Sequence, residues 1–188
     1  NFTNANLFNA NLTGVKLTDA NLTGASLAGV NLFASTLTNT KLTNLRGVKS
    51  GSIKGHPILP EPYLLANGYI LGPGVNLAGA EYLRSLNLTG ADLTSANLTE
   101  ANLSLTDLTD AKLTDADLTG ANLTGVKMTN ANLTRTTLTN AKLTKANLIN
   151  ARLSGAKLQG ANLTFVIMEG AILCNTTMPD GSVIYSGC

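Results

Sequence analysis

Large apolar residues recur at every fifth position through most of this 188-residue chain. The first series runs from Phe2 to Leu42, and Leu77 and Tyr82 keep its phase. One additional residue then shifts the phase, and a second series runs from Leu88 to Leu173 without a gap. A small residue, usually alanine, stands two places before each large one, and threonine commonly follows it.

A period of five matches neither the 3.6-residue period of a helix nor the two-residue period of a strand. On a helix the leucines would advance by about 140° per step and surround the whole cylinder. The chain must instead turn at every unit, so that neighbouring coils hydrogen-bond about 4.7–4.9 Å apart. Charged residues make up 13%, against roughly 25% in an ordinary domain, and aromatic residues 4%. The repeat and the composition together predict a solenoid.

The individual units resemble those of a known family. Ala91-Asp92-Leu93-Thr94-Ser95 and Ala121-Asn122-Leu123-Thr124-Gly125 are similar to the A-(N/D)-L-x-x motif of the pentapeptide-repeat family. The resemblance implies an all-β fold, a right-handed quadrilateral β-helix with four units, about 20 residues, in each coil. It also implies that leucine and alanine point inward, with Val15, Val30, Val126 and Val166 as larger variants. Burying each leucine contributes roughly 1.5–3 kcal/mol.

A coil of this length makes residues 20 positions apart neighbours on adjacent coils. Three outward pairs then have opposite charges: Asp92 with Lys112, Asp107 with Lys127, and Asp115 with Arg135. Each exposed pair is worth under about 1 kcal/mol, so these pairs indicate register rather than stability.

We expect one solenoid domain over residues 1–188, with first coils at 1–45 and an inserted loop at 46–74. A second run of coils follows at 75–178 and a capping tail at 179–188. The inserted segment should leave the coil near Arg46–Lys49 and rejoin at Val75. The additional residue should form a bulge or a wider corner near Leu83–Leu86.

The inserted loop contains a hairpin signal. Residues 63–66 and 69–72 flank Asn67-Gly68, which suits the two positive-φ positions of a type I′ turn. In one interpretation Tyr63, Leu65, Tyr69 and Leu71 cover a flank of the solenoid. In the other, the hairpin is a docking platform for a partner, with Tyr63, Leu64 and Tyr69 on its surface. His56, the sole histidine, has no metal-ligand partner at a suitable spacing.

The C-terminal segment suggests a cap. A solenoid end needs protection against edge pairing, and Pro179-Asp180-Gly181 is a turn signal that ends the repeat. Cys174 and Cys188 are either free thiols or a disulfide. A disulfide would favour an oxidising compartment. Residues 173–181 also resemble the tail of exported cyanobacterial members of the family. That resemblance implies the periplasm or the thylakoid lumen, with the cytoplasm as the second choice.

Both ends of the solenoid are candidate contact surfaces. Phe165, Ile167 and Ile172 occupy positions that normally face outward, and they form either a seat for the tail or a dimer patch. The chain opens inside the repeat at Asn1, so we expect a mature or trimmed product whose N-terminal end was uncapped or stacks on another molecule.

Several function classes are excluded by sequence. The chain lacks a phosphate loop and the G-x-S-x-G, H-E-x-x-H and C-x-x-C motifs, so we expect no enzyme activity, cofactor or metal. A net charge of +2 is too small for a nucleic-acid footprint. No apolar run is long enough to span a membrane. The expected partner is another protein, with a homodimer through a solenoid end as one form of it.

The leading hypothesis is a structural or protein-interaction solenoid. A DNA-mimicking topoisomerase regulator is the first alternative, which the resemblance suggests, but such mimics need an acidic rod. Here six acids at residues 92–117 are followed by six bases at 118–168. Ice or ordered-water binding is the second alternative, because outward threonines stack at 20-residue spacing. Threonine lies on all four faces, however, whereas an ice-binding surface should be one flat face.

Overall fold

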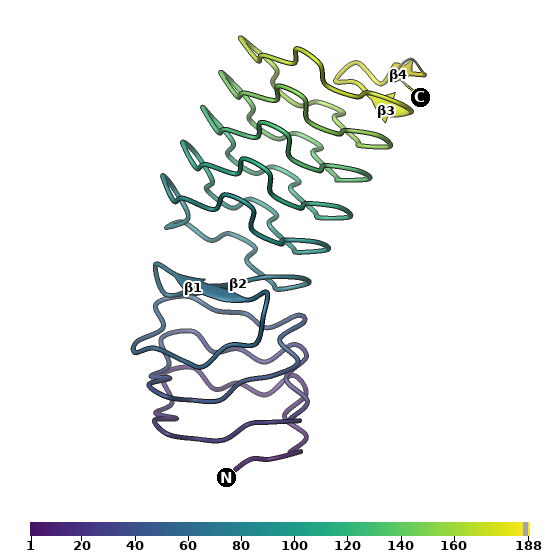
Figure 1. Ribbon diagram of the computed structural model, residues 1–188. Coiled ribbons are helices and arrows are strands. Elements are labelled where there is room, and N and C mark those ends of the chain that lie inside the picture. Colours follow the sequence, from purple (N-terminus) through teal and green to yellow (C-terminus); the bar gives the residue numbers. More distant parts are fainter. Residues whose placement is uncertain (186–187) are drawn as a thin grey trace. The chain divides into compact units, whose positions relative to one another are not determined.

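The computed structural model describes residues 1–185 and 188, and the chain divides into two compact units, Asn1–Leu77 and Ala78–Cys188. Stacked coils build each unit (Figure 1). The described residues contain no helix. The regular strands are β1 (Leu64–Ala66), β2 (Tyr69–Leu71), β3 (Thr176–Thr177) and β4 (Val183–Ile184). The coils themselves are joined by single parallel bridges. That residues 1–188 behave as one domain stays a prediction.

The second unit, residues 78–188, has the predicted 20-residue coil. Bridges join residues 20 positions apart, from Asn87 with Asp107 to Lys157 with Thr177. Within this ladder each central residue donates its N–H to the next coil, as Leu98 does to the Asp117 carbonyl at 2.7 Å. The four five-residue units of each coil therefore follow directly from the repeat.

The motif explains the corner between two units. The Leu118 carbonyl accepts the Ala121 N–H at 3.0 Å, and the intervening Gly120 has φ of 66°. A type II turn requires a positive φ at this third position, which glycine, asparagine and aspartate adopt most readily. The outward aspartate or asparagine directly before the leucine then fixes the turn, since Asp117 Oδ1 accepts the Thr119 N–H at 3.0 Å.

The interior consists mainly of stacked leucine and alanine, as predicted. Val30 and Val126 are fully buried, whereas Val15 and Val166 are half-buried. The interior also contains threonines that were not among the predicted inward residues: Thr40, Thr106, Thr136 and Thr176. Each of these hydroxyls donates to the carbonyl of a leucine 23 residues earlier, at 2.7–2.9 Å. The bond removes the cost of burying a hydroxyl group.

The additional residue lies next to the predicted place, in a widened turn at residues 82–85, but the side chain that points inward differs from the one expected. Tyr82 is 64% exposed and Leu83 is fully buried, so Leu83 takes the inward place predicted for Tyr82. The Asn102 N–H reaches back 22 residues to Ala80, whereas the Asp107 N–H reaches back 21 to Leu86. The additional residue therefore lies between Ala80 and Leu86, where the polar-tipped Tyr82 remains in water while Leu83 is buried.

The predicted departure near Arg46–Lys49 is also wrong. The chain stays in the coil of the first unit, residues 1–77, through parallel bridges of Lys49, Lys54 and Ile58 to the preceding coil. The reason is that Leu45, Val48 and Ile53 supply buried side chains at irregular spacing. Bridge partners here are therefore 17–18 residues apart, as for Lys41 with Ile58. Val75 is buried and Asn76 bridges Lys49, so the chain is back in the coil there.

Between these coil segments β1 and β2 pair antiparallel, with Ala66 opposite Tyr69. Asn67 and Gly68 both have positive φ, 46° and 76°, as a type I′ turn requires. All three residues of β2 are buried, and the Ile70 N–H donates to Ser50 Oγ at 2.8 Å. The hairpin therefore rests on the coil through β2.

Candidate interaction surface at the C-terminal end

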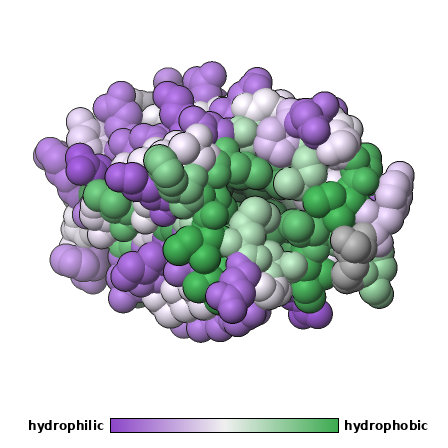
Figure 2. Space-filling model, turned by 90° about the horizontal axis from the view of Figure 1, so that it is seen from above, coloured by the Kyte–Doolittle hydropathy of each residue, from purple (hydrophilic) through white to green (hydrophobic). Residues whose placement is uncertain are grey.

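The last coil of the second unit exposes residues that earlier coils bury. Leu143, Leu148 and Leu153 are fully buried, whereas Leu163, Met168 and Leu173, at the same places one coil later, are half-buried. Figure 2 looks onto this end, where hydrophobic residues gather. We call this surface the end face; it comprises Leu163, Phe165, Val166, Ile167, Met168, Ile172 and Leu173.

The end face has backbone N–H groups that no backbone carbonyl of the described residues accepts. In the coil below, Leu148 and Leu153 donate their N–H groups to the carbonyls of Ile167 and Ile172, at 2.8 Å each. The corresponding N–H groups of Met168 and Leu173 have no backbone acceptor within residues 1–185 and 188. The end face thus combines apolar side chains with the open edge of a β-ladder.

The structure leaves two predicted surface residues uncovered. Phe165 is 76% exposed and Ile167 52% exposed, while Ile172 is half-buried. The interpretation of these residues as a seat for the tail is therefore wrong for Phe165 and Ile167, because the described part of the tail does not cover them. In the coil below, the places of Ile167 and Ile172 hold Asn147 and Arg152.

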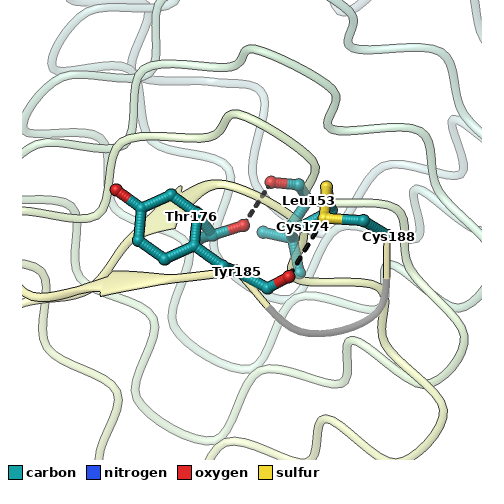
Figure 3. Close-up of a disulfide and its surroundings, with 5 residues drawn as sticks. All are labelled: Leu153, Cys174, Thr176, Tyr185 and Cys188. Carbon is teal, nitrogen blue, oxygen red and sulfur yellow. Dashed lines mark hydrogen bonds between the residues drawn. A yellow bond between two sulfur atoms is a disulfide. The ribbon is translucent and has the colours of Figure 1, made fainter.

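The tail pairs with another side of the same coil. β4 runs antiparallel to β3, with Thr177 opposite Val183. A disulfide joins Cys174 to Cys188, with 4.9 Å between their Cα atoms (Figure 3). Close to it the Thr176 hydroxyl donates to the Leu153 carbonyl at 2.7 Å. The tail is thus attached to the last coil by a covalent bond and a short strand pair.

The structure brings together all three of the charge pairs expected from 20-residue spacing. Lys112 Nζ lies 3.9 Å from Asp92 Oδ2, Lys127 Nζ lies 3.6 Å from Asp107 Oδ2, and Arg135 Nη2 lies 2.7 Å from Asp115 Oδ2.

The hydrogen bonds from Arg135 lower the pKa of Asp115 below its ordinary value. For Asp107 the pKa is lowered first by the Thr109 hydroxyl and backbone, with Lys127 contributing less.

The predicted hairpin surface is only partly available. Tyr63 and Leu64 are half-buried, but Tyr69 is 6% exposed, so it is not a surface residue. The platform interpretation is therefore wrong for Tyr69, whereas the burial of Tyr69 and Leu71 agrees with the other interpretation, in which they cover a flank of the solenoid.

His56 is exposed. No group of three histidine, cysteine or acidic residues that could hold a metal ion occurs in the described ranges. No helix within them is long and apolar enough to cross a membrane.

The end face offers apolar contact and hydrogen-bonding backbone, which is the chemistry of protein binding.

Comparisons with known proteins agree with this architecture. The family model for pentapeptide repeats, with 8 copies, matches residues 1–39, 87–125 and 116–155, together more than half of the chain. A comparison with curated protein sequences gives no significant match.

Solved structures of similar proteins include HetL, a pentapeptide repeat protein involved in heterocyst differentiation regulation in the cyanobacterium Nostoc. It is 28% identical, with 98% of this chain and 93% of that chain covered and a TM-score of 0.29. A pentapeptide repeat protein from the Arabidopsis thaliana thylakoid lumen is 27% identical, with 52% and 72% covered and a TM-score of 0.34. Full-length QnrB1, a plasmid-mediated fluoroquinolone resistance protein, is 15% identical, with 97% and 89% covered and a TM-score of 0.53. At this identity the likeness to QnrB1 shows the fold alone.

Proposed function

The chain belongs to the pentapeptide-repeat family, and on that premise we propose that it is a non-catalytic scaffold that docks a partner protein on the end face. The observation that carries this proposal is the exposure of Phe165 and Ile167 at the open edge of the last coil. A partner that covers them would remove apolar surface from water, and this burial stabilises a complex by roughly 25 cal/mol per Å².

The side chain at the Phe165 corner supports the proposal. Phe165 has φ of 57°, a left-handed conformation that costs an ordinary L-residue roughly 1–2 kcal/mol. The equivalent corners of the two preceding coils are Lys145, with φ of 60°, and Gly125, so this conformation is a feature of the repeat and the side chain is what differs. An exposed aromatic ring gains nothing from its contact with water, whereas a partner that covers it would remove that apolar surface from solvent.

The test separates binding from folding. A double variant, Phe165→Asn with Ile167→Thr, removes both apolar side chains and relaxes the corner, so its melting temperature should equal or exceed that of the parent protein. Leu105→Asn is the matched control, because Leu105 is also exposed with φ of 60° but lies outside the end face. Cross-linking and co-purification from the source organism should recover one partner with the parent and the control, and lose it with the double variant.

Sedimentation velocity covers the case in which the partner is a second copy. A homodimer through the end face should dissociate in the double variant and persist in Leu105→Asn. If all three proteins recover the same partners and show the same sedimentation, the end face is not the docking surface.

The disulfide supports an oxidising compartment. Such bonds persist in the periplasm and other oxidising spaces and are rare in the cytosol. We therefore favour the periplasm or the thylakoid lumen over the cytoplasm as the location of the chain.

The DNA-mimic alternative loses support from the charge pairs. A mimic needs acidic groups free to imitate phosphates, but Asp92, Asp107 and Asp115 each lie beside a cation. The acidic band at residues 92–117 is therefore partly neutralised on the surface itself.

A further inference from the structure

A cleft of about 610 Å³ lies in the first unit, where the segment after Ile58 passes over the coil. Its lining includes Ala28, Thr43, Arg46, Pro60 and Tyr63. Small-molecule sites in proteins commonly have volumes of about 300–1,000 Å³ and combine apolar walls with a few polar groups. The cleft lies in residues 1–77, and nothing about it depends on the end face.

Arg46 supplies the charge of this cleft. No carboxylate is among the lining residues, and the Arg46 side chain makes no ion pair or hydrogen bond within the described parts of the chain. A Cβ atom on Gly74 would approach Arg46 Nε, Cγ and Cζ to 3.2–3.3 Å. The guanidinium group therefore lies against the bare backbone of Gly74, with its N–H donors uncompensated by an anion.

Tyr63 forms a wall of the cleft and is held in the same way. A Cβ atom on Gly72 would overlap the Tyr63 ring, so the ring lies on the backbone of this glycine. The Tyr63 hydroxyl donates to the Pro73 carbonyl at 2.9 Å, which fixes the ring at its far end. The segment Gly72-Pro73-Gly74 thus contacts both Tyr63 and Arg46.

The remaining lining residues complete an amphipathic site. The Thr43 hydroxyl accepts the Gly24 N–H at 2.9 Å and retains its own proton for donation. Pro60 and Ala28 add apolar surface to the lining of the cleft. A guanidinium group binds a carboxylate through two parallel hydrogen bonds, and an aromatic ring favours a flat apolar body.

We propose that this cleft binds a small aromatic carboxylate, whose carboxylate group pairs with Arg46 and whose ring packs against Tyr63 and Pro60. The Tyr63 ring is already fixed by its hydrogen bond to the Pro73 carbonyl, and the exposed Arg46 side chain is accessible to a carboxylate. A carboxylate without a ring, such as acetate, lacks the apolar contact, and a neutral aromatic amide lacks the charge.

Isothermal titration calorimetry of the full chain tests the proposal with 2-naphthoate, its neutral analogue 2-naphthamide, and acetate. We expect 2-naphthoate to bind at least tenfold more tightly than either of the others. Arg46→Gln should weaken 2-naphthoate binding at least tenfold. Lys49→Gln is the control with the same loss of charge outside the cleft, and it should leave the affinity unchanged.

A second variant guards against a folding defect. Gly74→Ala shifts Arg46 slightly without removing its charge, so it should weaken 2-naphthoate binding less than Arg46→Gln does, with circular dichroism reporting whether each variant is folded. The proposal is overturned if the parent protein shows no binding of 2-naphthoate at millimolar concentration. Equal affinity for the amide, or an unchanged affinity in folded Arg46→Gln, overturns it as well. Tighter binding of a tripeptide with a free C-terminal carboxylate would replace the small molecule with a peptide terminus.

Discussion

Arg135 binds the carboxylate of Asp115, 20 residues earlier in the chain, through two parallel hydrogen bonds. Nε to Oδ1 and Nη2 to Oδ2 both measure 2.7 Å. Asp115 and Arg135 occupy the same corner position on adjacent coils, and both have positive φ, 59° and 56° respectively. The repeat period therefore places a planar guanidinium opposite a planar carboxylate, the geometry that this pair of groups prefers.

Replacing Arg135 should raise the pKa of Asp115. The Arg135 hydrogen bonds are the largest cause of its lowered pKa, followed in the same direction by the Arg135 charge. In Arg135→Gln the pKa of Asp115 should return toward the ordinary value of about 3.9, as measured by NMR titration of the side-chain carboxyl carbon. Arg152→Gln, a control with the same charge change, should leave it where it is. An unchanged pKa in Arg135→Gln would mean that the pair does not form in solution.

For Asp107 a threonine matters more than the lysine. The Thr109 hydroxyl donates to Asp107 Oδ1 at 2.6 Å, and this bond is the largest cause of the lowered pKa. Thr109→Val should therefore raise the pKa of Asp107 more than Lys127→Gln does, again by NMR titration. The reverse order would show that the charge of Lys127 dominates.

The same pKa shift fixes the sign of the pH dependence. A carboxyl group whose pKa is lower in the folded protein stabilises it above the unfolded pKa of about 3.9. That contribution is lost as the pH falls through the folded pKa of Asp107. Thr109→Val should consequently lower the free energy of unfolding at neutral pH. In acid the difference between the variant and the parent protein should become smaller.

The buried threonines provide a test of the interior. Thr136 is buried and its hydroxyl donates to the Leu113 carbonyl at 2.8 Å. Thr136→Val keeps the shape and removes the bond, so the free energy of unfolding in urea should fall by about 0.5–1.5 kcal/mol. Thr89→Val changes an exposed threonine and should stay within about 0.5 kcal/mol of the parent. Equal effects of the two substitutions would argue against an inward Thr136.

Removing the disulfide should affect the tail and leave the coils intact. The double variant Cys174→Ser with Cys188→Ser opens a closed loop of about 15 residues, worth up to about 3 kcal/mol. Hydrogen exchange should accelerate at the Met178 amide, which donates to Ser182 at 2.7 Å. The Leu123 amide, bonded to Lys142 on the next coil at 2.8 Å, should keep its rate. Unchanged exchange at Met178 would show that the tail is held without the disulfide.

The regular coils could be predicted because one period determines several properties together. The five-residue step fixes which side chains point inward, and four steps fix the neighbours, so Asp115 and Arg135 were paired from their numbers alone. The inward threonines were missed because threonine is mainly an outward residue of the motif. A signal existed, since Thr106 and Thr136 occupy the place of alanine two before a leucine.

The irregular segment could not be predicted in the same way. Residues 46–58 remain in the coil through Val48 and Ile53, whose spacing departs from five. Sequence alone treated this loss of period as a departure from the fold, whereas burial of branched side chains keeps the chain in place. For the end face, the sequence identified Phe165, Ile167 and Ile172, but their exposure depends on the path of the tail, which no period governs.

The 20-residue neighbour relation is the basis of the whole account, and pyrene excimer fluorescence tests it most directly. Thr119→Cys with Thr139→Cys places two labels on the same face of adjacent coils, since Asp117 bridges Thr137 two residues earlier. Such coils lie about 4.8 Å apart. This pair should give strong excimer emission, and Thr119→Cys with Thr134→Cys, on neighbouring faces, should give much less. Excimer emission from the second pair and none from the first would contradict the four-unit coil.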